Sequence, residues 1–125
     1  MDINRPEVHA EVSAVFAVYE QALVGNDVER LDELFWHSEH TIRYGTGETL
    51  VGIDAIRAFR QARSAIGLAR TLRNTVITTY GRDFATAMTE FRRTAQASVG
   101  RQSQTWVRMP EGWRVVAAHV SVVPE

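Results

Sequence analysis

Residues 99–123, VGRQSQTWVRMPEGWRVVAAHVSVV, decide the fold class of this chain of 125 residues. Two runs rich in valine, threonine and aromatic residues, 99–109 and 112–123, flank a short Pro-Glu-Gly turn. Such runs on either side of a turn are typical of a β-hairpin. The end of the chain is therefore predicted to form two long antiparallel strands.

The same character extends backwards to residue 69. Residues 69–80 and 83–95 are rich in threonine, valine, isoleucine and aromatic residues, and the segments Tyr-Gly-Arg-Asp and Gln-Ala-Ser-Val-Gly separate the runs. Strands that follow one another through short turns usually pair with their neighbours in sequence. The second half of the chain is predicted to be a meander of four antiparallel strands.

The first half has a helical pattern instead. Residues 6–25 repeat apolar side chains at helical spacing, with Pro6 in the first turn and a glycine at the end. Asn26 is predicted to cap a second, short helix, with Glu29 completing a capping box. A short strand is expected over 40–45, and a third helix over 52–64.

Three helices followed by an antiparallel sheet predict an α+β domain over residues 1–125, with the helices packed on one face. A strongly curved sheet wrapped around a helix leaves a cone with an open mouth. Such a mouth is a natural pocket for a small molecule.

The composition excludes several kinds of chemistry. The formal net charge is −1, so general binding to nucleic acid phosphates or to an anionic membrane is not expected. Cysteine and lysine are both absent, which removes disulfides, thiol nucleophiles and Schiff bases. No long apolar run occurs and the N-terminal residues are polar, so a cytoplasmic protein is expected.

Several segments, spread over the whole chain, resemble one protein family. They are Ile3–Val8, Leu31–Trp36, Thr41–Gly45, Gly67–Thr71, Gly100–Arg108 and Gly112–Ser121. Together with the order of elements they resemble the AtzH-like family, which includes the oxalurate catabolism protein HpxZ. That family belongs to the nuclear transport factor 2-like (SnoaL-like) superfamily, so the resemblance implies its cone-shaped fold.

The resemblance also implies an activity. AtzH-like proteins occur beside amidase-signature enzymes, and in cyanuric acid breakdown the family activity is a decarboxylating amidase that converts 1,3-dicarboxyurea to allophanate. The family's catalytic tyrosine on the first helix and arginine on the first strand correspond to Tyr19 and Arg43. Neither a metal nor a cofactor is implied.

The residues themselves leave alternatives open. Tyr19 lies on the apolar stripe of the first helix, where a tyrosine is either part of the core or a proton donor at its edge. Arg43 either faces solvent or points into the cone, where it would need an anionic partner such as a substrate carboxylate. Arg70, at the start of a long strand, is a candidate second clamp for a carboxylate, and Arg73 and Arg101 are weaker candidates.

Histidines provide further candidates. His119 and Ser121 are expected to share one face of the last strand with Trp113 and Val115, and so to bind substrate or to belong to the core. His37 and His40 suggest a metal site only weakly, because a third ligand is not evident.

The sequence is compatible with three functions. The first is a cofactor-independent amidohydrolase or decarboxylase for a small, doubly anionic carboxylated urea. The second is a non-catalytic ligand-binding or accessory protein that works with an amidase-signature enzyme. The third, an isomerase or cyclase for an apolar substrate, is disfavoured by the arginines. A homodimer or larger homo-oligomer, formed through the outer face of the sheet, is also expected.

Overall fold

The computed structural model describes residues 1–94 and 96–124. Three helices and six strands follow one another along the chain. They are α1 (Pro6–Val24), α2 (Val28–Leu34), β1 (Ile42–Tyr44), β2 (Thr49–Val51), α3 (Ile53–Ala62), β3 (Arg70–Tyr80), β4 (Phe84–Arg93), β5 (Val99–Met109) and β6 (Gly112–Val123).

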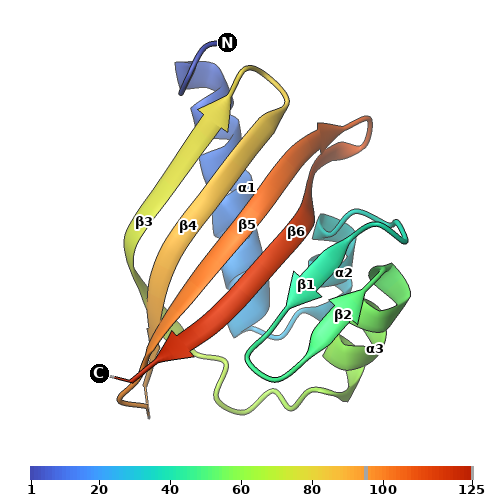
Figure 1. Ribbon diagram of the computed structural model, residues 1–125, viewed down its shortest axis with the longest axis vertical. Helices are drawn as coiled ribbons and strands as arrows, with labels where there is room; N and C mark the ends of the chain where they lie inside the picture. Colours follow the sequence, from blue (N-terminus) through green and yellow to red (C-terminus); the bar gives the residue numbers. More distant parts are fainter. Residues whose placement is uncertain (95, 125) are drawn as a thin grey trace.

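The four long strands form the predicted meander. All strands belong to one sheet in the order β2-β1-β6-β5-β4-β3, and each long strand pairs antiparallel with the next. Helix α1 crosses behind the long strands, whereas α2 and α3 lie beside the short strands β1 and β2 (Figure 1). The α+β class and the placement of the helices on one face are confirmed.

The short strands differ from the prediction. The hairpin of β1 and β2 adds to the sheet through β1, which runs parallel to β6, so the sheet is not purely antiparallel. Strand β2 was not predicted at all. Strands of three residues contain too few side chains for alternation to be recognised, and a partner far away in sequence holds this hairpin in place.

The helices begin and end close to the predicted residues. Pro6 opens α1, and the chain leaves it at Gly25. The cap of α2 is Asp27 and not Asn26, because the Asp27 carboxylate accepts a hydrogen bond from the Arg30 amide at 3.1 Å. Asn26 adopts a positive φ of 51° and forms the turn that separates the two helices.

The core lies between α1 and the inner face of the sheet. Val12, Phe16, Trp106 and Val115 are fully or almost fully buried there. A second anchor joins α2 to α3, where the buried Arg60 guanidinium donates to the Asp32 carboxylate at 2.5 Å and covers the Phe35 ring. These contacts fix the end of α3 against the sheet, beside the short strands.

A bulge in β6 changes which residues face the core. Trp106 pairs with Val115, but the preceding residue, Thr105, pairs with Ala117, so Val116 is an extra residue in the ladder. Since strand side chains alternate, one inserted residue moves every later side chain to the opposite face. Beyond the bulge, Ala118 packs against the core.

No helix among the described residues is long and apolar enough to span a membrane.

Candidate functional site

A polar cavity of about 310 Å³ lies where the β1–β2 hairpin, the end of α3 and the end of β4 meet. The loop that follows α3 closes another side of it. The side chains important for its chemistry are Arg43, Glu48, Phe59, Arg63, Arg93 and Val120. Three guanidinium groups and one carboxylate therefore converge on a single small space.

Arg43 enters this cavity from the middle of β1. Because side chains alternate along a strand, its neighbours Ile42 and Tyr44 line a hollow on the other face of the sheet. The Arg43 side chain is 14% exposed, its guanidinium covers the Phe59 ring at 5.3 Å, and its Nη1 donates to Glu48 Oε1 at 2.8 Å. Arg43 thus points into the cone and has an anionic partner within the chain.

Arg63 and Arg93 have no such partner among the described residues. The Nε and Nη2 atoms of Arg63 and the Nε atom of Arg93 are buried, and within residues 1–94 and 96–124 they have no hydrogen-bond acceptor. Burial lowers the pKa of both guanidinium groups below the usual arginine value, and the charge of Arg43 lowers both further. An anion bound in the cavity would accept hydrogen bonds from these buried nitrogen atoms and would stabilise the charged forms of both guanidinium groups.

The arrangement is suited to binding a small anion that carries two negative charges. Guanidinium groups bind carboxylates through paired, charge-assisted hydrogen bonds. Of the three cations, Glu48 neutralises one, which leaves the charges of Arg63 and Arg93 uncompensated by any described carboxylate in the cavity. A dianion would complete the charge balance.

Tyr19 lies in the core and is not among the residues that line the cavity. It is 5% exposed, and its ring packs against Phe35 and edge-on against Trp106, with ring centroids 6.2 Å apart in both pairs. The Phe35 ring also contacts the guanidinium of Arg60, which lies one helical turn before Arg63. Tyr19 is therefore a core residue that is linked through the Phe35 ring to the end of α3.

Arg70 is placed differently from expectation. Its guanidinium donates to both carboxylate oxygens of Glu20, at 2.8 and 2.7 Å, and to Gln102 Oε1 at 3.0 Å. The side chain is 1% exposed and covers the Phe91 ring. Arg70 is the ladder partner of Arg93 and its charge lowers the pKa of the Arg93 guanidinium, but Arg70 does not line the cavity. The second and third cations beside Arg43 are Arg63 and Arg93.

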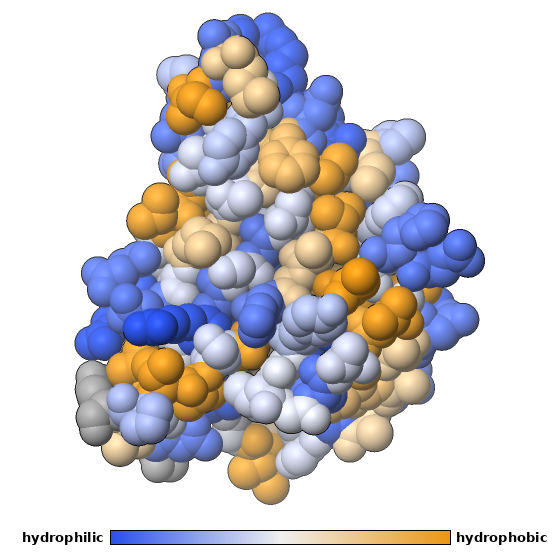
Figure 2. Space-filling model, in the orientation of Figure 1, coloured by the Kyte–Doolittle hydropathy of each residue, from blue (hydrophilic) through white to orange (hydrophobic). Residues whose placement is uncertain are grey.

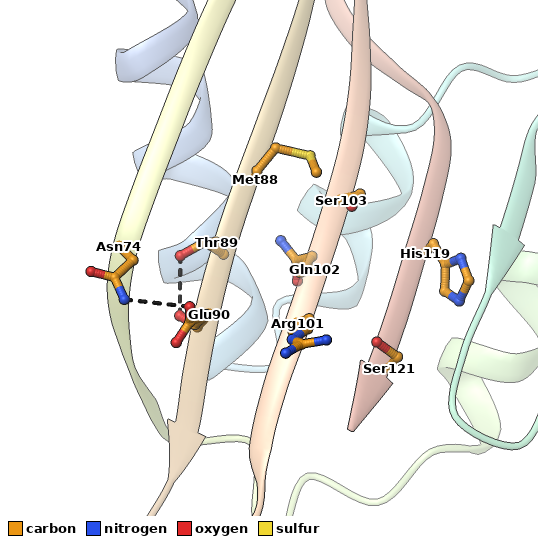
Figure 3. A pocket seen from close by; sticks show the side chains of 9 residues that line it. All are labelled: Asn74, Met88, Thr89, Glu90, Arg101, Gln102, Ser103, His119 and Ser121. Carbon is orange, nitrogen blue, oxygen red and sulfur yellow. Dashed lines mark hydrogen bonds between the residues drawn. The ribbon is translucent and has the colours of Figure 1, made fainter. Parts of the chain in front are cut away.

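His119 and Ser121 lie on the opposite face of the sheet. They line a separate hollow of about 310 Å³, together with Arg101 and Glu90 (Figure 3). The expectation that they share a face with Trp113 and Val115 was wrong, because the bulge at Val116 reverses the alternation between the two pairs. The structure does not bring these two residues together with Tyr19 and Arg43.

The remaining polar candidates have structural contacts. Arg73 pairs with Glu90 at 2.9 Å on the outer face of the sheet. His37 Nε2 donates to the Asp32 carbonyl at 2.9 Å, and His40 stacks on Trp36. The described part of the chain contains no group of three or more histidine, cysteine, aspartate or glutamate residues that could hold a metal ion.

Two residues of the cavity were missed from the sequence, although it contains a signal for each. Arg93 follows Phe91 by two positions, so alternation places it on the same inner face as that buried ring. Arg63 lies one helical turn beyond Arg60, which is buried. Glu48 has no such signal, because only the folded hairpin brings its carboxylate to Arg43.

Solved structures with the same fold cover almost the whole chain. A protein of unknown function from Pectobacterium atrosepticum is 65% identical, with a TM-score of 0.97, and the match covers 98% of this chain and 95% of that one. A cystatin-like fold protein from Burkholderia xenovorans is 48% identical, with a TM-score of 0.96 and coverage of 100% and 98%.

A more distant structure supports the superfamily. A nuclear transport factor 2-like superfamily protein from Salmonella enterica is 26% identical, with a TM-score of 0.75 and coverage of 95% and 92%. The comparison with curated proteins found no match. The AtzH-like family matches residues 1–125, and the chain therefore belongs to the AtzH-like family, with a nuclear transport factor 2-like fold.

Proposed function

We propose that this protein is a decarboxylating amidohydrolase for a small carboxylated urea, with 1,3-dicarboxyurea as substrate and allophanate as product. The observation that carries the proposal is the cavity in which Arg43, Arg63 and Arg93 converge while Glu48 neutralises only one of them. Dicarboxyurea carries two carboxylates on a short planar frame, which matches the two uncompensated cations in number. The substrate class follows from this charge balance together with the family.

Substrate binding would use the guanidinium groups that have no partner. One carboxylate would accept hydrogen bonds from Arg63 and the other from Arg93, whose buried Nε atoms lack acceptors among the described residues. The Arg43 guanidinium would then lie beside the central carbonyl oxygen. Phe59, under Arg43, limits the orientations that this guanidinium can adopt.

The chemical step breaks one N–carboxylate bond. The electron pair of that bond moves to nitrogen and is delocalised onto the urea carbonyl oxygen, where Arg43 stabilises the developing negative charge. Carbon dioxide leaves, and a proton from the Tyr19 hydroxyl, directly or through one water molecule, is transferred to nitrogen. Solvent returns a proton to Tyr19. If water attacks the carboxyl carbon instead, the same two residues polarise the carbonyl and orient the water.

A non-catalytic role as a ligand-binding or accessory protein is the alternative. It would be favoured by a cavity that is uncharged or filled by apolar side chains. The cavity instead contains three arginines. We further propose, from the resemblance to AtzH-like proteins, that the enzyme acts in the cytoplasm and that an amidase-signature enzyme consumes the allophanate it forms.

A substrate panel tests this function. Purified protein would be incubated with 1,3-dicarboxyurea and with other ureido acids, and both carbon dioxide and ammonia would be followed against the spontaneous rates. We expect accelerated release of carbon dioxide from dicarboxyurea without ammonia. Binding without acceleration of any compound would contradict catalysis and support the accessory role.

We further propose that two copies associate through the outer face of the sheet. Phe84 and Met88 are exposed and alternate along β4 with the buried Ala85 and Ala87, and the exposed Val76 is paired with Met88 in the ladder. Figure 2 shows apolar side chains between polar ones on this face. Glu90, Arg73 and Arg101 provide both signs of charge on it, so a two-fold axis could place opposite charges of two copies together. Light scattering at micromolar concentration should give the mass of a dimer or larger oligomer, and a monomer would contradict this assembly.

A further inference from the structure

Glu48 lies inside the candidate site and has no role in the chemistry described above. Its Oε1 atom accepts a hydrogen bond from Arg43 Nη1 at 2.8 Å, and the Glu48 side chain is 23% exposed. Among residues 1–94 and 96–124, Glu48 provides the one carboxylate that lines the cavity. The charge of the empty cavity therefore depends on this side chain.

The hairpin between β1 and β2 is shaped to bring the carboxylate to this position. A Cβ atom at Gly45 would lie 1.7 Å from Glu48 Oε1, so a residue with a side chain there would displace the carboxylate. The Gly45 amide donates to the Glu48 carbonyl at 2.9 Å and closes the turn. The Gly47 amide donates to Glu48 Oε2 at 3.2 Å. The position of Glu48 thus depends on glycine at 45.

We infer that Glu48 is a specificity-determining residue that sets the number of negative charges the site accepts. This inference rests on the proposed function. Three guanidinium groups and one carboxylate leave two positive charges, so a dianion is balanced, a monoanion leaves a buried cation unpaired, and a trianion brings an excess negative charge. Removing the charge of Glu48 should shift the preference towards trianions.

The probes can be matched in shape. Glutarate has the five-atom backbone of dicarboxyurea and two carboxylates, butyrate has one carboxylate fewer, and tricarballylate is glutarate with a third carboxylate on its central carbon. 3-Methylglutarate controls for the bulk of that extra group. Their dissociation constants would be measured by calorimetry at pH 7.5 and constant ionic strength.

The test variant is Glu48→Gln, which keeps the shape and the oxygen that accepts from Arg43. The wild-type protein should bind glutarate more tightly than either butyrate or tricarballylate. In Glu48→Gln the affinity for tricarballylate relative to glutarate should rise about tenfold or more, the scale of one added charge at short range in a partly buried site. Gly45→Ala, which forces the carboxylate away from Arg43, should shift the ratio in the same direction.

The control is Glu39→Gln, which removes the same charge from a side chain that is 88% exposed. It should leave the ratio unchanged. If Glu48→Gln has the wild-type ratio, or loses glutarate binding altogether, Glu48 does not set the charge preference and the inference is wrong, while the proposed function stands. If the wild-type protein binds none of the anions, both the anion site and the inference are overturned.

Discussion

Arg63 and Arg93 share one cavity, and the positive charge of Arg93 is among the causes that lower the pKa of the Arg63 guanidinium. Two cations that repel each other in a partly buried space weaken the fold, because the folded state disfavours their charged forms. No described carboxylate offsets this repulsion between them. Such a loss of stability is typical of a binding site whose ligand supplies the opposite charge.

Replacing Tyr19 by phenylalanine tests its role as proton donor. Tyr19→Phe removes one oxygen and keeps the ring contacts with Phe35 and Trp106, so the fold should be preserved. We expect kcat on dicarboxyurea to fall by roughly 10²-fold or more, the scale of positioned acid–base catalysis, with little change in glutarate affinity. Tyr80→Phe, on the outer face, is the matched control. If folded Tyr19→Phe keeps near-full turnover, the Tyr19 hydroxyl has no catalytic role and the residue serves only in the core.

Replacing Arg43 by lysine separates charge from shape. Lysine keeps the positive charge but loses the planar fork and the stacking on Phe59. We expect kcat to fall by about as much as in Tyr19→Phe, whereas Arg30→Lys, at an exposed site, should have wild-type kinetics. Activity within about twofold of wild type in Arg43→Lys would show that a point charge is sufficient.

Replacing Arg63 by methionine should stabilise the protein and remove ligand binding. The change relieves the repulsion among the arginines and the burial of a guanidinium without an acceptor. Because solvent screens a partly exposed group, we expect a modest rise in Tm of about 2 °C. Glutarate should raise the Tm of the wild-type protein but not of this variant. A lower Tm with unchanged stabilisation by glutarate would contradict both the repulsion at Arg63 and its role in ligand binding.

Replacing His119 by alanine tests its placement on the outer face. His119 packs edge-on against Tyr44 at 5.8 Å, away from the arginine cavity. We expect kcat/KM to stay within about twofold of wild type, since surface substitutions away from a site are usually mild. A loss of about 10²-fold in kcat with the fold intact would show that His119 belongs to the active site.

Glu90 is expected to make the stability of the fold depend on pH. Hydrogen bonds from Asn74 and Arg73 lower the pKa of the Glu90 carboxyl below its usual value of 4.5. A carboxyl whose pKa is lower in the folded state stabilises the fold above pH 4.5, and this contribution is lost as pH falls through the folded pKa. Glu90→Gln should therefore lower Tm slightly at pH 7 and flatten the dependence of Tm on pH below 4.5. An identical slope in both proteins would contradict this contribution.

The sequence predicted the elements well where patterns are long. Helix α1 and the four long strands agree with the prediction to within two residues at each end, except that the predicted end of β4, residue 95, lies outside the described residues. The bulge at Val116 was not predicted, because it is a single inserted residue in a run with apolar side chains on both faces. The alternation of apolar and polar residues is therefore compatible with either register. That one residue moved His119 and Ser121 out of the candidate site.

The arginines show why the ion pairs of the site could not be predicted from the sequence. Arg70 and Arg93 are paired in the ladder of β3 and β4, and from the sequence either could serve as a cation for a ligand. Which of them is free depends on Glu20, which is 50 residues from Arg70 in sequence and neutralises it. Long-range ion pairs of this kind are not visible in local patterns. Alternation likewise places Arg43 on the face opposite Ile42 and Tyr44, but it does not say which of the two faces is the inner one.

A crystal structure of the protein with glutarate would show whether the arginine cavity binds a dianion. We expect glutarate in the cavity, with its two carboxylates hydrogen-bonded to Arg63 and Arg93 and its central carbon beside Arg43 and near the Tyr19 hydroxyl. Glutarate bound only on the outer face near His119 and Arg101, or absent from the cavity at saturating concentration, would contradict this expectation.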